Sequence, residues 1–314
     1  MSISAVPAPA PDQDATPETK KAKKKLASAT GQAARAVSSP WASGFAVLMA
    51  IAWTTPTLGL LITSFRKQED IQESGWWNAW RTGFTGKNYV EAFNGGGANA
   101  TPLSQFFVNS IVIAIPAVLL PLLLAALAAY AFAWMKFPFR NGLFVAVFAL
   151  QIVPLQIALL PLTQMFQKLG INGSYWALWL SHGVFALPLA VYLLHNFMKE
   201  IPASLLEAAQ VDGAGHLRIF TRILMPLIAP ALASFGIFQF LWVWNDLLVA
   251  MTMLGGSPER APITMALNQV SGTLGNRWYL LSAAAFISIA LPVAVFLGLQ
   301  RYFVRGLLAG GQKG

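Results

Sequence analysis

The stretch that decides the fold runs Glu207-Ala208-Ala209-Gln210-Val211-Asp212-Gly213-Ala214 and continues to Ile223-Leu224-Met225-Pro226. It is a polar interruption between two long apolar segments. Good helix formers fill positions 204–210. Asp212-Gly213-Ala214-Gly215 then ends that helix, because glycine adopts the left-handed cap conformation without a steric penalty. The stretch therefore predicts two short helices joined by a glycine turn.

Each of these short helices has an apolar side. The first has Leu205, Leu206 and Ala209 on one face, and the second has a stripe of Leu217, Phe220, Ile223 and Leu224. Proline lacks an N–H, so Pro202 suits the first turn of the first helix and Pro226 ends the second. Patterning alone is also compatible with a well-capped surface loop that has no further role.

The composition is that of a protein built into a membrane. Of its 314 residues, 56% are hydrophobic and 11% are charged, and the mean hydropathy is +0.57, whereas about a quarter of the residues in a soluble domain are charged. Apolar segments long enough to cross a hydrocarbon core of about 30 Å lie at 41–65, 106–134, 142–166, 176–197, 227–251 and 280–304. We therefore expect an all-α membrane protein with six transmembrane helices, in which the helix pair forms a cytoplasmic loop between spans four and five.

The distribution of positive charge favours cytoplasmic termini. With both ends inside, 14 of the 21 lysines and arginines fall in inside regions and 7 in outside regions. Five lysines lie between residues 20 and 25, in a Pro/Ala-rich start without interleaved aromatic residues. Such a run is typical of a disordered tail near anionic lipid and not of a nucleic-acid-binding arm. We expect residues 1–40 to be a disordered basic cytoplasmic tail and 41–314 a six-span domain without a nucleic-acid partner.

Polar side chains inside the spans are candidates for a substrate pathway. They are Gln151 and Gln156 in the third span and Asn245 and Asp246 in the fifth. A carboxylate inside a membrane is costly and normally faces protein or water. Asp246 therefore either locks a helix end by hydrogen bonding or lines the pathway. Several prolines, among them Pro154, also indicate bent spans around a pathway.

The chain lacks the residue patterns of an enzyme. It has no cysteine, its three histidines have no metal-ligand spacing, and no Gly-x-x-x-x-Gly-Lys phosphate loop is present. We expect no catalytic residue, no metal site and no bound nucleotide.

The order of residues in the helix pair resembles a known signature. Glu-Ala-Ala at 207–209, Asp-Gly at 212–213 and Ile-x-x-Pro at 223–226 resemble the signature loop in the membrane subunits of ATP-binding-cassette importers. The version here is similar to that of the carbohydrate-uptake permeases, in particular the smaller membrane subunit of maltose and α-glucoside transporters. Trp-Asn-Asp at 244–246 and the ending at 300–310 also resemble this family, so the likeness covers residues 41–314.

This resemblance implies a permease subunit of an ATP-driven, binding-protein-dependent sugar importer in the bacterial inner membrane. Its implied partners are a second homologous permease subunit, two cytoplasmic ATP-binding-cassette subunits that bind the ATP, and an extracytoplasmic sugar-binding protein. A disaccharide or other α-glucoside is the substrate that family analogy favours.

The resemblance also implies which residues couple to the ATPase subunit: Glu207, Ala208, Ala209, Asp212, Gly213, Arg218 and Pro226. Glu207 and Asp212 are expected to cap helices or make charged contacts, Gly213 to supply the turn, and the two alanines to permit close approach. The glycine-punctuated outer loop 254–278 is expected to be mobile and, by the same resemblance, to reach into the binding protein.

The alternative is a secondary transporter driven by an ion gradient, with Asp246 as the carrier site. Such transporters have inverted repeats and an ion site at the middle of the membrane. The sequence shows no internal repeat and a lone carboxylate in its spans.

Overall fold

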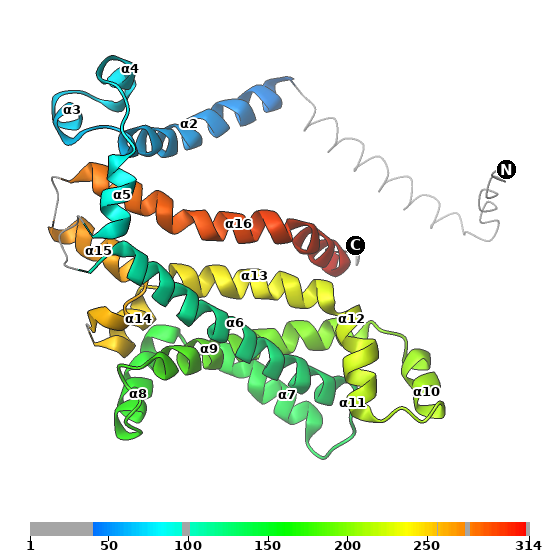
Figure 1. Ribbon diagram of the computed structural model, residues 1–314. Coiled ribbons are helices and arrows are strands. Elements are labelled where there is room, and N and C mark those ends of the chain that lie inside the picture. The colour runs from blue at the N-terminus through cyan, green and yellow to red at the C-terminus, as the bar shows by residue number, and fades with distance from the viewer. Residues whose placement is uncertain (1–39, 96–100, 256, 274–276, 312–314) are drawn as a thin grey trace. The chain divides into compact units, whose positions relative to one another are not determined.

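The computed structural model describes residues 40–95, 101–255, 257–273 and 277–311, and all regular secondary structure in these ranges is helical (Figure 1). The expected basic tail and parts of both outer glycine-rich stretches lie outside the described residues. The chain divides into two compact units after Leu60. The first contains most of helix α2 (Pro40–Ser64), and every site discussed below lies in the second.

The long helices of the second unit are α6 (Leu103–Trp134), α9 (Tyr175–Lys199), α13 (Ala229–Asn245) and α16 (Trp278–Gly311). Helices of intermediate length are α7 (Arg140–Ala149), which continues as the 3-10 turn η2 (Leu150–Ile152), and α8 (Leu155–Lys168). The short elements are α3 (Gln68–Glu73), η1 (Trp76–Asn78), α4 (Ala79–Thr82), α5 (Lys87–Asn94), α10 (Ala203–Val211), α11 (His216–Ile219), the π-helical turn η3 (Phe220–Leu224), α12 (Met225–Leu227), α14 (Leu248–Leu254), η4 (Pro258–Arg260) and α15 (Ile263–Thr273).

Four helices, α2, α6, α9 and α16, are each long and apolar enough to cross a membrane. Two bent pairs pass the same test only when their members are taken together: Arg140–Ile152 with Leu155–Lys168, bent by 103°, and His216–Leu227 with Ala229–Asn245, bent by 72°. The described chain thus has six spans when each bent pair counts as one. The third and fifth spans are not the continuous helices expected over 142–166 and 227–251.

The break in the third span has a local cause. Val153 precedes Pro154 and is extended, with φ −71° and ψ 117°, because a residue before proline is driven out of the helical region. The bend of the second pair lies at Ile228, with φ −90° and ψ 2°. The segment expected over 227–251 is interrupted once more, since α13 ends at Asn245 and α14 begins at Leu248. Asp246 between them is extended as well, with φ −70° and ψ 135°. The prolines inside α6, α8, α9 and α16 leave their helices continuous.

Small residues bring the central helices of the second unit close together. Ala114, Ala117, Ala125, Ala126 and Ala129 on α6 are fully buried, as is Ala190 on α9. Small side chains allow helix backbones to approach in a membrane, where the hydrophobic effect does not drive helices together. Figure 1 shows α10 and α11 at one end of the resulting bundle and α14 and α15 at the other.

The end that carries α14 and α15 is fastened by side chains of α6. The amide of Asn109 donates to the carbonyls of Glu259 and Ala261, at 2.8 and 3.1 Å. The hydroxyl of Ser110 accepts from the N–H of Ile263 at 2.8 Å. The outer segment therefore contains an anchored helix, α15, where the sequence predicted only a mobile loop. Asn109 and Ser110 lie more than a hundred residues away, so no local pattern reveals this anchor.

Candidate functional site

The first candidate site is the helix pair, and its turn has a defined backbone geometry. The N–H of Ala214 donates to the carbonyl of Ala209 at 2.9 Å, and that of Gly213 to Gln210 at 3.0 Å. Gly213 has φ +78°. These bonds and the left-handed glycine make a Schellman motif, which satisfies the last carbonyls of α10. The predicted helix, glycine turn and second helix are all present.

The inner face of the pair packs against its own bundle. Leu206, Ala209, Ile219, Phe220 and Leu224 are buried in one apolar cluster with α6 and α9. Ala209 therefore packs within this chain, where the sequence analysis expected it to permit close approach of a partner.

The expected apolar stripe on the second helix is only partly correct. Phe220 and Leu224 are buried, but Leu217 is 75% exposed and Ile219 takes the inward position. The helix continues from Phe220 as a π-helical turn, which contains more residues per turn than an α-helix. A stripe drawn from the sequence with α-helical period misplaces Leu217.

The outer face of the pair combines apolar and charged side chains. Val211 is 87% exposed, and Glu207, Asp212 and Arg218 are exposed beside it. Within the described part of the chain, no hydrogen bond or ion pair involves the side chains of these three charged residues. They are not side-chain caps of their own helices, so their charges are available to a partner. Ala208 and Pro226 are exposed as well.

A tyrosine that the sequence analysis did not single out ties the pair to a spanning helix. The hydroxyl of Tyr130, at the end of α6, lies 2.7 Å from Nδ1 of His216 at the start of α11. The Tyr130 ring also packs against Phe220, with ring centroids 5.5 Å apart. These two contacts fasten α11 and the start of η3 to α6.

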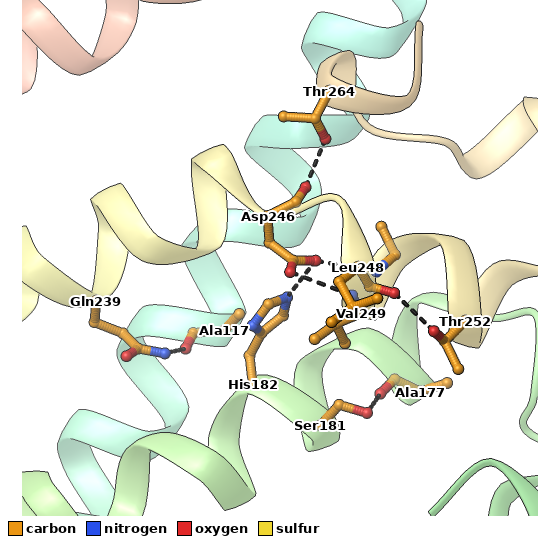
Figure 2. A network of polar contacts seen from close by, with 11 residues as sticks. Ala117, Ala177, Ser181, His182, Gln239, Asp246, Leu248, Val249, Thr252 and Thr264 are labelled. Carbon is orange, nitrogen blue, oxygen red and sulfur yellow. Dashed lines mark hydrogen bonds and ion pairs between the residues drawn. The ribbon is translucent and has the colours of Figure 1, made fainter. Parts of the chain in front are cut away.

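The second candidate site is the polar network at the broken fifth span (Figure 2). The Asp246 carboxylate accepts the N–H groups of Val249 at 3.2 Å and Ala250 at 3.0 Å. The backbone carbonyl of Asp246 accepts a hydrogen bond from the Thr264 hydroxyl at 2.6 Å. Nε2 of His182 lies 3.8 Å from Oδ2 of Asp246. Asp246 thus caps α14 and is hydrogen-bonded to α15, with His182 of α9 beside it. Helix locking by hydrogen bonds is one of the two roles that the sequence analysis gave this residue.

The third candidate site is a cavity of about 620 Å³ between η2, α8, α9 and α13. Aromatic side chains form much of its wall: Phe185, Phe235, Phe238 and Trp242. Its amides are Gln151 and Gln239, and the Gln239 amide nitrogen donates to the carbonyl of Ala117 at 3.2 Å. None of the described residues that line it is ionisable.

The structure brings only one of the predicted pathway residues to this cavity. Gln151 lines it, whereas Gln156, Asn245 and Asp246 do not. Asn245 instead bonds the carbonyl of Leu241, one turn earlier, at 2.8 Å. Gln239 was not predicted, although a lone glutamine within an apolar span is a signal that could have found it. Among the described residues no cluster of three His, Asp or Glu side chains could hold a metal ion.

Comparison with known proteins gives these sites a context. Residues 117–308 match the family model described as binding-protein-dependent transport system inner membrane component. The osmoprotective compounds uptake permease GgtD of Synechocystis sp. is 48% identical, over 84% of this chain and 89% of its own. The alpha-glucoside transport system permease AglG of Rhizobium meliloti is 47% identical, over 74% of this chain and 61% of its own.

A solved structure has the same fold. A chain of a bacterial ABC transporter involved in the import of the acidic polysaccharide alginate superimposes with a TM-score of 0.68 at 19% identity, over 83% of this chain and 94% of its own. The family match covers more than half of the chain and includes both bent pairs and the helices α10 and α11. The protein therefore belongs to the family of binding-protein-dependent transport system inner membrane components, and it is a multi-pass transport permease.

Proposed function

We propose that this chain is one of two membrane subunits of an ATP-driven importer of short neutral carbohydrates, with α-glucosides as the substrate class. This substrate class is proposed by analogy with the alpha-glucoside transport system permease AglG, which is 47% identical to this chain. Two cytoplasmic ATP-binding-cassette subunits would hydrolyse the ATP, and an extracytoplasmic binding protein would deliver the sugar. This chain would have no catalytic activity and would form half of the pathway.

The observation that carries the coupling role is the outer face of the helix pair. Val211 and Leu217 are exposed apolar side chains, 87% and 75% accessible, on a segment whose other face is buried. Exposed apolar side chains rimmed by unpaired charges are typical of a protein contact. Glu207, Asp212 and Arg218 supply those charges. We assign this face to the ATP-binding-cassette subunit.

The proposed coupling runs from this face into the membrane. When the ATPase subunits close around ATP, they would move α10 and α11 as one body, because the Schellman turn and the buried inner face hold the pair together. The contact between Tyr130 and His216 would pass the movement to α6, and the continuous run from α11 to α12 would pass it to α13.

The opposite end of the bundle would meet the binding protein. There the anchored segment of η4 and α15 is held by Asn109 and Ser110, and Arg260 donates to the carbonyl of Gly173 at 3.1 Å. This end would face the outside and the helix pair the cytoplasm, with both termini inside.

Co-purification of the ATPase subunit with permease variants tests the proposal. Leu217→Asp should reduce the amount retained, because it places a charge in an apolar contact. Leu169→Asp is the matched control, since Leu169 is also exposed, at 63%, but follows α8 away from the helix pair. Glu207→Lys should reduce retention more than Glu207→Ala, because it adds a repulsive charge.

Equal retention by Leu217→Asp, Leu169→Asp and the unchanged protein would contradict the assignment of this face. Uptake by this chain alone, abolished by an ionophore, would instead support an ion-gradient mechanism.

A further inference from the structure

Given the proposed function, we infer that the cavity between η2, α8, α9 and α13 is a sugar site within this chain, selective for neutral glycosides, with Gln151 as the residue that hydrogen-bonds the sugar. The sequence pattern had pointed to four polar side chains on two spans. Of these, Gln151 lines a defined cavity, together with Gln239 and Trp242.

The size and wall of the cavity suit a small polar ligand with apolar faces. Its volume of about 620 Å³ lies within the range of about 300–1,000 Å³ that is usual for small-molecule sites. A sugar ring has hydroxyl groups at its edge and C–H groups on its faces. The indole of Trp242 and the neighbouring phenylalanine rings offer broad apolar surfaces to such faces.

The two glutamines supply the polar part of the site. An amide side chain both donates and accepts hydrogen bonds, which matches a hydroxyl group. The nitrogen of Gln239 is already bound to Ala117, which fixes the amide and leaves its oxygen as an acceptor (Figure 2). Gln151 is exposed on η2, so its whole amide can turn towards a ligand.

The broken third span is what makes room for the ligand. The chain turns by 103° between η2 and α8, and Val153 and Pro154, at the break, line the cavity. Non-helical backbone within a membrane is tolerated where it is buried in protein or lines a water-filled cavity. The break thus places non-helical backbone in the cavity wall, an arrangement compatible with a water-filled cavity.

The absence of charge among the described lining residues sets the ligand class. A uronate or other acidic sugar would bring a carboxylate into a site without a positive side chain, and removing an unpaired charge from water is very costly. A neutral glycoside meets no such penalty. The cavity therefore favours neutral sugars over acidic ones such as fragments of alginate.

Cysteine protection tests this site without relying on transport. The chain has no native cysteine, so Ala158→Cys, at a lining residue that makes no proposed hydrogen bond to the sugar, introduces a single thiol into an assembled transporter whose other subunits lack cysteine. A small neutral maleimide should modify this thiol. Maltose or trehalose should slow the modification about three- to tenfold, whereas an unsaturated alginate disaccharide should not. Lys168→Cys, on an exposed residue outside the cavity, is the control and should be modified at the same rate with and without sugar.

Three results would overturn the inference: no modification of Ala158→Cys, no protection by either neutral sugar, or equal protection by the acidic one. Equal protection of Lys168→Cys would also do so, because the effect would then be general to the protein.

Uptake by glutamine variants gives a second readout. Gln151→Ala should lower uptake of maltose about three- to tenfold, the loss expected for about one neutral hydrogen bond. Gln156→Ala is the matched control, because this glutamine is also exposed on the third span but does not line the cavity. Equal uptake by both variants would overturn the role of Gln151. If the unchanged transporter takes up no neutral glycoside at all, the proposed function fails instead, and the cysteine experiment still reports on the site.

Discussion

At the scale of single residues, the effect of backbone conformation at Gly213 can be tested separately from the effect of steric crowding. A Cβ atom added at Gly213 or at Gly215 would meet no heavy atom within 4 Å. Only Gly213 has a positive φ, +78°, whereas Gly215 has φ −73°. The two glycines flank Ala214 and so form a natural pair for comparison.

We expect Gly213→Val to abolish sugar-stimulated ATP hydrolysis by the assembled transporter while the protein stays inserted and abundant. The left-handed conformation costs a β-branched residue about 1–3 kcal/mol, which misdirects the helix pair without unfolding the bundle. Gly215→Val should keep most of the activity. ATPase assays with quantified membrane levels check this, and equal activity of the two variants would remove the turn from the mechanism.

Asp246 offers a second residue-scale prediction. Removing its carboxylate frees two N–H groups at the start of α14, and loss of a helix cap costs about 0.5–2 kcal/mol. Asp246→Ala should therefore lower the midpoint of thermal unfolding more than Asp246→Asn, which keeps an acceptor oxygen. Asp246→Asn should retain ATP-driven uptake. Its complete loss, with normal folding, would restore Asp246 as a carrier site.

At the scale of elements, the proposed coupling depends on the contacts that hold the helix pair on the bundle. Tyr130→Phe removes the hydroxyl that reaches His216 and keeps the ring contact with Phe220. We expect a several-fold fall in sugar-stimulated ATPase activity with unchanged binding of the ATPase subunit, because a hydrogen bond worth about 0.5–1.5 kcal/mol no longer fixes α11 to α6. The double variant Tyr130→Phe/His216→Ala should be no worse than His216→Ala alone.

Tyr192→Phe is the control for this prediction. Tyr192 stacks on Phe148, and its hydroxyl has no hydrogen-bond partner within the described residues. Its removal should leave coupling unchanged. If Tyr130→Phe behaves in the same way, the hydrogen bond to His216 has no part in transmission.

At the scale of the whole molecule, the two ends of the bundle should differ in accessibility. In intact cells, a membrane-impermeant maleimide should label Lys168→Cys but not Leu217→Cys. Both variants should be labelled after the membrane is permeabilised. The absence of native cysteine makes each label unambiguous. Labelling of Leu217→Cys from outside would reverse the proposed orientation and place the helix pair away from the ATPase subunits.

Features that depend on local chemistry could be predicted from the sequence. Apolar length identified the spans, because a hydrocarbon core accepts only long apolar helices. The Asp212-Gly213 turn was predictable, because glycine is the residue that reaches positive φ without strain. Family membership followed from the order of residues in 207–226 and was confirmed by the family match over residues 117–308.

Contacts between side chains far apart in sequence depend on how the helices pack and could not be predicted from local patterns. Tyr130 and His216 are 86 residues apart, and Gln239 bonds a carbonyl 122 residues away. Leu217 was misplaced because periodicity alone does not show which side of α11 packs on the bundle, and Ile219 takes the inward position. The size of the bend at Pro154, and the cavity behind it, likewise depend on how α8, α9 and α13 pack. Proline marks where a helix can break, but the packing of neighbouring helices sets the angle and the space that remains.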